Sequence, residues 1–169
     1  MANINKELIE KLTVREVLPS DTELIGEFFT AMGAESRALF NRRGFNERGI
    51  LKYLSRPDAT RRYFLALIDD KMAGYFFFLD FDSSIPEMGI AVRDDLRGMG
   101  LGTHLVGLAK KKAILEGKGG LQLTTHVANL RAQTLYESAG FVNKGVCKNG
   151  SELFYLWSIR KKDFDELSK

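Results

Sequence analysis

The sequence predicts a mixed α/β fold whose central sheet is mostly antiparallel. Two apolar stretches, at residues 63–79 and 141–159, are each interrupted by a short polar turn, which is typical of β-hairpins. Between them, a strand at 87–92, an amphipathic helix at 101–116 and a strand at 121–125 follow the order of a βαβ unit. Hairpins on either side of a βαβ unit give one sheet in which only the central strand pair is parallel.

The residues before the first hairpin predict one strand and two helices. A strand is expected at 12–16, where polar and apolar residues alternate. Ser20 or Asp21 can cap a helix that ends at Gly33. The buried side of this helix is expected to hold four apolar residues, Leu24, Ile25, Phe28 and Phe29. A second helix at 47–54 ends before the next proline.

The first hairpin is predicted from strands at 63–68 and 72–79, which are joined by the polar turn at 69–71. The return strand is apolar at nearly every position, so we expect helices to cover both of its faces.

The C-terminal part predicts a helix followed by the second hairpin. The helix is expected at 129–139, with Gly140 as its C-cap. The hairpin strands are expected at 141–146 and 154–159, with the turn at 148–150 between them.

Length and composition indicate a single soluble domain. A chain of 169 residues is large enough for one hydrophobic core, so we expect one domain over 1–169, in which 1–11 form an arm or a short helix. Hydrophobic content of 44% and charged content of 28% are ordinary for a globular protein. The N-terminus lacks the apolar core of a signal peptide, and the single cysteine, Cys147, excludes an internal disulfide. We therefore expect a cytoplasmic location.

Charge and residue spacing argue against several kinds of partner. The net charge of +3 suits an anionic cofactor, and no arginine-rich tail favours nucleic acid. No apolar run reaches transmembrane length, so no membrane partner is expected. The two histidines, His104 and His126, lie apart from each other and from Cys147, so no metal site is expected.

The strand at 87–92 leads to three alternating glycines, Gly98, Gly100 and Gly102, directly before the central helix. Glycine allows positive φ and lets the backbone approach a ligand closely. The first turn of a helix has unpaired N–H groups and the positive end of the helix dipole. Together these features predict an anion site, most commonly for phosphate. The alternative is a glycine-rich turn that only starts an ordinary helix.

Two common phosphate-binding motifs do not fit this loop. A Walker A loop needs four residues between its glycines and then Lys-Ser or Lys-Thr, and a dinucleotide fingerprint needs glycine where Thr103 stands. A third pattern, Arg/Gln-x-x-Gly-x-Gly/Ala, fits residues Arg97 to Gly102 without a mismatch.

This third pattern resembles the pyrophosphate-binding signature of the GNAT superfamily of acyl-CoA-dependent N-acyltransferases. A second block, from Asn129 to Phe141, resembles the same family's segment Asn-x-x-Ala-x-x-Leu-Tyr-x-x-x-Gly-Phe at every fixed position. The two blocks stand in the family's order, with one strand between them, and the resemblance extends over residues 12–160.

The resemblance implies a GNAT-like form of the α/β fold, with a βαβ core and a splayed strand pair. It also implies an N-acetyltransferase that takes acetyl-CoA as acyl donor, needs no metal, and transfers the acetyl group to a primary amine by direct attack in a ternary complex. The family's cofactor contacts fall on the following positions of this chain: Ile90, Ala91, Val92, Arg97, Gly98, Met99, Gly100, Leu101, Gly102, Thr103, Asn129, Ala132 and Tyr136.

The resemblance also implies two catalytic residues. Tyr136 stands at the family's tyrosine position, where it would protonate the departing thiolate, although core packing alone would also explain it. Glu87 would be the general base or the anchor of a water chain, with water and His126 as alternatives. In a regular strand Glu87 shares a face with Gly89, where its alternative role is a salt bridge at the strand start, and a bulge at that glycine would change the face. Asn129 has two interpretations, a helix N-cap and a cofactor contact.

The acceptor implied by the resemblance is a small amine, an amino acid or a peptide. The run from Glu87 to Asp95 looks like the strand and loop of bacterial protein-lysine acetyltransferases, so a protein lysine is an alternative acceptor. A non-catalytic acyl-CoA sensor is a further alternative, but it would need neither Glu87 nor Tyr136. In the family, the segment between the first two helices forms one wall of the acceptor site, which here points to residues 34–54 together with the terminal hairpin. Both monomer and homodimer stay open.

Overall fold

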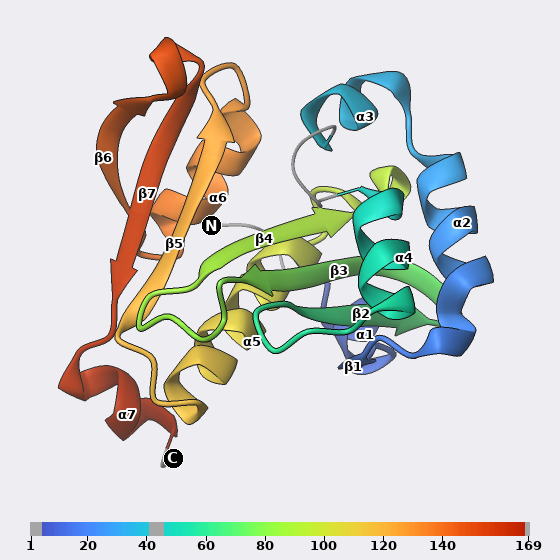
Figure 1. Ribbon diagram of the computed structural model, residues 1–169, viewed down its shortest axis with the longest axis horizontal. Helices are drawn as coiled ribbons and strands as arrows, with labels where there is room; N and C mark the ends of the chain where they lie inside the picture. Colours follow the sequence, from blue (N-terminus) through green and yellow to red (C-terminus); the bar gives the residue numbers. More distant parts are fainter. Residues whose placement is uncertain (1–4, 41–45, 168–169) are drawn as a thin grey trace.

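The computed structural model describes residues 5–40 and 46–167. It contains a seven-stranded sheet in the order β1-β2-β3-β4-β5-β7-β6. Every pair of neighbouring strands is antiparallel except β4 and β5, which are parallel. This confirms the predicted mixed α/β fold with a mostly antiparallel sheet and a βαβ core (Figure 1).

The strands are β1 (Thr13–Glu16), β2 (Arg62–Ile68), β3 (Lys71–Leu79), β4 (Glu87–Val92), β5 (Gly120–His126), β6 (Val142–Cys147) and β7 (Glu152–Ser158). The α-helices are α1 (Lys6–Glu10), α2 (Thr22–Ala31), α3 (Ala34–Phe40), α4 (Glu47–Ser55), α5 (Leu101–Leu115), α6 (Leu130–Ser138) and α7 (Lys161–Leu167). Three short 3₁₀ segments are η1 (Pro19–Asp21), η2 (Asp94–Leu96) and η3 (Lys148–Gly150). None of the described helices is long and apolar enough to cross a bilayer.

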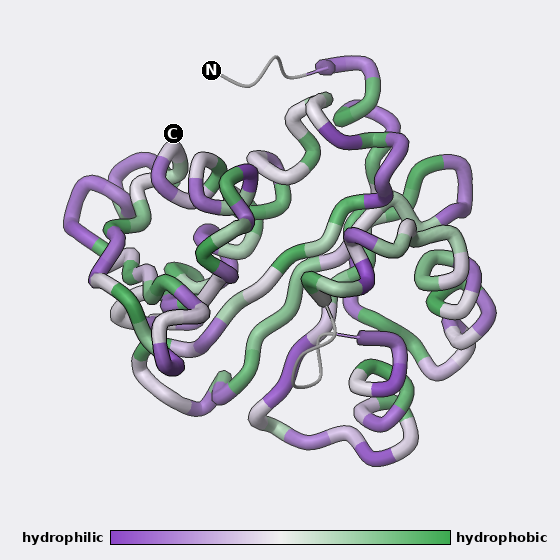
Figure 2. Tube along the Cα trace, turned by 90° about the horizontal axis from the view of Figure 1, so that it is seen from above, coloured by the Kyte–Doolittle hydropathy of each residue, from purple (hydrophilic) through white to green (hydrophobic). Residues whose placement is uncertain are grey.

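Strand β3 lies at the centre of two apolar clusters, as its sequence predicts. Phe76 and Phe78 belong to a cluster with the α5 side chains, whereas Tyr75 and Phe77 belong to a second cluster with α2 and Ile50 of α4. Successive side chains of a strand point to opposite faces, so the apolar run is buried on both sides. Figure 2 shows, along the Cα trace, that many residues of the sheet are hydrophobic (green).

The hairpin between β2 and β3 has the predicted turn. Asp69 and Asp70 are its two central residues, with φ of 49° and 59°. Positive φ at both positions is the geometry of a type I′ turn, whose twist matches that of the flanking strands. Aspartate tolerates this region better than branched residues do.

Strands β4 and β5 diverge, which confirms the splayed pair (Figure 1). They pair at one position, Glu87 with Gln122, where the Gln122 N–H donates to the Pro86 carbonyl at 3.1 Å. Nearby, the Gly119 N–H donates to the Ser84 carbonyl at 2.7 Å. These bonds close one end of the pair, and beyond them the β5-facing edge of β4 has no strand partner among the described residues.

The N-terminal arm contains the short helix α1, which contacts the glycine loop. The Asn5 side chain caps this helix by accepting from the Leu8 N–H at 3.1 Å. The backbone N–H of Asn5 donates to the Met99 carbonyl at 3.0 Å. Residues 1–4 lie outside the described part of the chain.

Two elements differ from the sequence prediction. Helices α3 and α7 both occupy segments for which no helix was predicted, because their short, polar sequences show little apolar periodicity. Two smaller details also differ from the prediction. The predicted C-cap Gly140 stands one residue beyond the cap Ala139 and has φ of 85°. Glycine in the left-handed region is common at that position. Of the four apolar residues predicted to be buried in α2, Leu24 is only half-buried.

Candidate active site

The glycine loop begins helix α5 without a side-chain cap. Gly98 and Gly100 have φ of 75° and 84°, and Gly100 is the left-handed N-cap of the helix. None of the side chains in the described part of the chain caps the first turn, so its N–H groups keep the bonding capacity that an anion can use. A Cβ on Gly98 would meet no atom within 4 Å, so this side of the loop is open. Both glycines therefore have the conformation predicted for an anion-binding loop.

The other residues of the loop have different surroundings. A Cβ on Gly102 would lie 3.3 Å from Cδ2 of Leu135, so this glycine lets α5 and α6 pack closely. The Leu101 side chain is 1% exposed and lies in the core, which leaves only its backbone for a ligand. Met99 and Thr103 are half-buried on either side of the helix start.

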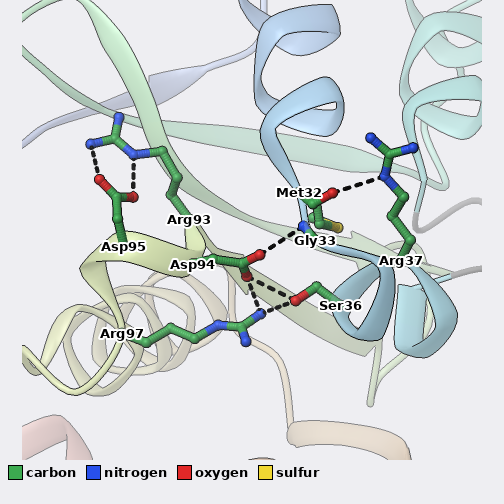
Figure 3. Close-up of polar contacts among 8 residues, drawn as sticks. All are labelled: Met32, Gly33, Ser36, Arg37, Arg93, Asp94, Asp95 and Arg97. Carbon is green, nitrogen blue, oxygen red and sulfur yellow. Dashed lines mark hydrogen bonds and ion pairs between the residues drawn. The ribbon is translucent and has the colours of Figure 1, made fainter.

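Arg97 contacts the end of α2 and the start of α3 through a shared carboxylate (Figure 3). Its Nη2 donates to the Ser36 hydroxyl at 2.6 Å and lies 2.5 Å from Oδ1 of Asp94. Asp94 also accepts from the Gly33 N–H at 2.8 Å and from the Ser36 hydroxyl at 2.8 Å. The phosphate role predicted for Arg97 stays a prediction, and the structure shows which protein groups hold its guanidinium.

Asp94 is ionised in this network. Burial by itself would raise its pKa, but the Gly33 and Ser36 hydrogen bonds and the charges of Arg97 and Arg131 outweigh burial and lower the pKa. Arg131 comes from the first turn of α6, so positive charge from two elements acts on the Asp94 carboxylate. Sequence reasoning did not identify Asp94 as a site residue, because its partners Ser36 and Gly33 are 58 and 61 residues away.

Strand β4 offers backbone groups at Ile90, Ala91 and Val92, the positions predicted to contact the cofactor. The Ala91 side chain is buried in the α2 cluster, whereas Ile90 and Val92 pack against the α5 cluster. The edge of these residues that faces β5 belongs to the splayed part of the strand. Their peptide groups, rather than their side chains, are therefore what this strand can present to a ligand.

The bulge considered for Gly89 is absent. Pairing of β3 with β4 runs without a register shift from Leu79 opposite Glu87 to Gly74 opposite Val92. A Cβ on Gly89 would lie 2.3 Å from Cζ of Phe77, so this glycine accommodates a core aromatic ring. Without a bulge, half-buried Glu87 shares a face with Ala91, which is the face covered by α2 and α4.

The start of α6 is held by side-chain caps. Oδ1 of Asn129 accepts from the Ala132 N–H at 3.2 Å, which confirms the N-cap interpretation and leaves the cofactor contact a prediction. Nδ1 of His126 accepts from the Ala128 N–H at 3.1 Å, so this histidine is a hydrogen-bonded strand-end residue. Ala132 itself is half-buried in the first turn.

Tyr136 lies one and a half turns into α6 and is 6% exposed. Its ring centroid lies 5.6 Å from that of Phe141 and 6.3 Å from that of Tyr155. Burial raises the pKa of the Tyr136 phenol above its ordinary value of 10, so the hydroxyl is protonated at neutral pH. Within residues 5–40 and 46–167, no hydrogen bond to this hydroxyl is found. The protonated phenol therefore has no hydrogen-bond acceptor among the described residues.

A family model for the acetyltransferase (GNAT) family matches residues 23–141, which contain both sequence blocks. The chain belongs to this family. It is an acyltransferase, and the acyl donor of this family is acetyl-CoA.

Solved structures of GNAT proteins have the same fold. The ribosomal-protein-S5-alanine acetyltransferase from Vibrio fischeri aligns with a TM-score of 0.76 at 16% identity, over 89% of this chain and 94% of that one. The GNAT domain of S. lividans PAT aligns at 0.73 and 16% identity, over 86% and 89%. The protein yncA from Salmonella typhimurium, solved with its cofactor acetyl-CoA, aligns at 0.70 and 21% identity, over 89% and 95%. No curated protein sequence matches the chain significantly.

The residues present fit acetyl-CoA. The uncapped start of α5 and the nearby Arg97 suit a pyrophosphate, because N–H groups and guanidinium ions are the usual phosphate donors in proteins. The free edge of β4 suits the amide groups of the pantetheine arm. No group of three or more His, Cys, Asp and Glu side chains within the described residues has the arrangement of a metal site.

Proposed function

We propose that this GNAT protein transfers the acetyl group of acetyl-CoA to a primary amine by direct attack in a ternary complex. The observation that carries the proposal is the combination of the free β4 edge with the protonated, buried Tyr136 of α6. A module that only senses acyl-CoA would need the loop and the strand edge, but it would not need an acid beside them.

In this proposal, the glycine loop, the start of α6 and strand β4 each bind a different part of acetyl-CoA. Backbone N–H groups of residues 98–103 hold the pyrophosphate, assisted by Arg97, and Asn129 and Ala132 contact the cofactor from the start of α6. The β4 backbone at 90–92 orients the pantetheine arm, and an N–H of the same stretch donates to the thioester oxygen. Acetyl-CoA supplies the activated acyl group. The protein supplies position, a donor for the developing negative charge, and groups that move protons.

Tyr136 donates its proton to the departing thiolate in this proposal. A phenol whose pKa is raised by burial keeps its proton at neutral pH, so this proton is present to hydrogen-bond the sulfur and to move toward it as the C–S bond breaks.

Glu87 takes the proton of the acceptor ammonium, directly or through water. The regular register of β4 keeps Glu87 on the face covered by α2 and α4, the side from which this proposal brings the acceptor. Helices α2, α3 and α4 lie together on one side of the sheet in Figure 1, and α3 and α4 belong to the predicted acceptor wall at 34–54. Residues 41–45 of that wall lie outside the described part of the chain. An amine that entered from this side would meet the carboxylate of Glu87.

The acceptor is a small amine, an amino acid or a peptide in this proposal. A protein substrate is the second candidate, because the fold is shared with a protein named for acetylating an alanine of a ribosomal protein and with the GNAT domain of PAT. Mass spectrometry of lysates incubated with the enzyme and acetyl-CoA distinguishes a protein acceptor from a small-molecule acceptor. New acetylated sites above the non-enzymatic background support a protein acceptor.

One experiment tests the function as a whole. Thiol release from acetyl-CoA is measured against polyamines, amino acids, aminoglycosides and lysine peptides, and CoA binding is measured in parallel by calorimetry. Release that depends on one acceptor class supports the proposal. Tight CoA binding without release for any acceptor identifies a sensor, and absence of CoA binding contradicts the cofactor site.

A further inference from the structure

Helix α3 is held to the rest of the protein by a small group of hydrogen bonds. Among its side chains described for burial, residues 34–39, only Ser36 is buried, at 2% exposed, and none belongs to the two apolar clusters. Ser36 donates to Asp94, and the Gly33 N–H directly before the helix donates to the same carboxylate. Arg37 bonds back to the carbonyls of Met32 and Thr30, which is local to the α2–α3 turn. Asp94 is therefore the described contact that holds α3 to the sheet.

Asp94 belongs to η2, between strand β4 and the glycine loop. It is two residues beyond Val92 and four residues before Gly98, so its carboxylate joins the predicted acceptor wall directly to the cofactor loop. Arg97 reinforces this link, because its Nη2 contacts both Asp94 and Ser36 (Figure 3). The same guanidinium has further N–H donors on Nε and Nη1, for which no partner is found among the described residues.

We propose that Asp94 is a positioning residue that fixes the α3 wall of the acceptor site to the cofactor loop, with Arg97 bridging this link to the bound pyrophosphate. The proposal rests on the proposed function of the loop. Nη2 contacts Asp94 and Ser36 while the remaining donors of Arg97 stay available for a phosphate oxygen. Cofactor binding then restrains Arg97 further, and through Arg97 it restrains α3.

The coupling works in both directions. Asp94 and Ser36 hold the guanidinium in place before the cofactor arrives, so less side-chain freedom is lost on binding. By linkage, bound CoA must stabilise the arrangement of α3 that favours its own binding. An acceptor amine therefore meets an ordered wall after the cofactor is bound.

Hydrogen–deuterium exchange of the full chain, with and without saturating coenzyme A, tests the coupling. In the wild type we expect CoA to slow exchange both at residues 98–103, the cofactor loop, and at residues 33–40, the α3 segment. In Asp94→Asn we expect 33–40 to exchange faster without CoA, and CoA to slow only 98–103. The expected change at 33–40 is on the order of tenfold, within the range of coupling between two sites.

Asp95→Asn is the matched control. It makes the same chemical change one residue along the chain, but Asp95 is exposed and pairs with Arg93 at 2.7 Å, and no hydrogen bond or ion pair to the described residues of α3 is found for it. We expect this variant to behave as the wild type in both segments. Ser36→Ala provides a second probe, because it removes one of the two α3 bonds to Asp94 and should reduce the CoA effect at 33–40 if Asp94→Asn fails to fold.

The outcomes distinguish this inference from the proposed function. If CoA slows exchange at 98–103 but leaves 33–40 unchanged in the wild type, the coupling is wrong while the cofactor site stands. Equal slowing at 33–40 in the wild type and in the Asp94→Asn and Ser36→Ala variants also overturns it. If the wild type shows no CoA effect at 98–103, the proposed cofactor site itself is wrong.

Discussion

Replacement of Tyr136 by phenylalanine removes only the hydroxyl group, so it tests a catalytic role of this residue without changing the packing of its ring. The ring stays in its contacts with Phe141 and Tyr155, because phenylalanine has the same shape without the hydroxyl. Since no hydrogen bond to that hydroxyl is found among the described residues, its loss should change the free energy of unfolding by less than about 1 kcal/mol. The pocket for CoA is unchanged, so the Kd for CoA should also stay close to that of the wild type.

The expected effect on turnover is large by comparison. A positioned general acid contributes a factor of about 10² or more, so kcat should fall about 100-fold, equivalent to about 2.7 kcal/mol of activation free energy. The pH dependence follows from the raised pKa of Tyr136: the protonated form is the active one, and it persists until the pH exceeds the ordinary value of 10. Wild-type kcat should therefore show no loss attributable to Tyr136 between pH 7 and about 9.

Tyr155→Phe is the matched control on the neighbouring strand. This tyrosine is also buried, but its hydroxyl donates to Oε1 of Glu137 at 2.8 Å. Its removal should cost about 1.5–3 kcal/mol of stability, as for a hydrogen bond to a charged group, and should leave kcat nearly unchanged. We would measure kcat under conditions where chemistry limits turnover. Calorimetry gives the Kd for CoA, and chemical denaturation gives the free energy of unfolding. An unchanged kcat in Tyr136→Phe would reduce this residue to core packing.

Three further substitutions test the remaining site and the core. Glu87→Gln should lower kcat/KM and remove the acidic limb of its pH profile, whereas a full-rate variant with the same limb would assign the proton to water or another group. Gly100→Val should weaken CoA binding in calorimetry, because a branched side chain is strained at φ of 84° and obstructs close approach of phosphate; undiminished affinity would contradict the loop assignment. Gly89→Ala should destabilise the protein by about 1–3 kcal/mol in denaturant, because its Cβ would overlap the ring of Phe77. Adding Phe77→Leu should recover part of this loss, and no recovery would refute the steric explanation.

The strands were the most predictable part of the fold. The apolar run of β3 and the aspartate turn at 69–70 carry their structure in local sequence, since periodicity and turn chemistry act over a few residues. Helices α3 and α7 could not be predicted in this way. Ser36 is buried by contact with Asp94, and no pattern within α3 itself marks that position.

In the candidate site, too, the local motifs could be predicted from the sequence and the packing could not. The glycine loop and the Asn129–Phe141 block are short motifs whose function depends on a local strand–turn–helix or on a helix start, so they were readable without the fold. The three loop glycines nevertheless serve two purposes: Gly98 and Gly100 adopt positive φ, whereas Gly102 makes room for Leu135 of α6. That distinction requires the packing of two helices.

By itself, the sequence determined the α/β class, the family and the two segments predicted to form the cofactor site, because each rests on residue types at close spacing. Only the tertiary structure decided on which face of β4 Glu87 lies, since that depends on register with β3 and on the absence of a bulge at Gly89. It also decided that Asp94 joins the cofactor loop to Gly33 and Ser36. A carboxylate's partners are set by which distant segments the sheet and helices bring within hydrogen-bond distance, and that proximity is a property of the whole fold.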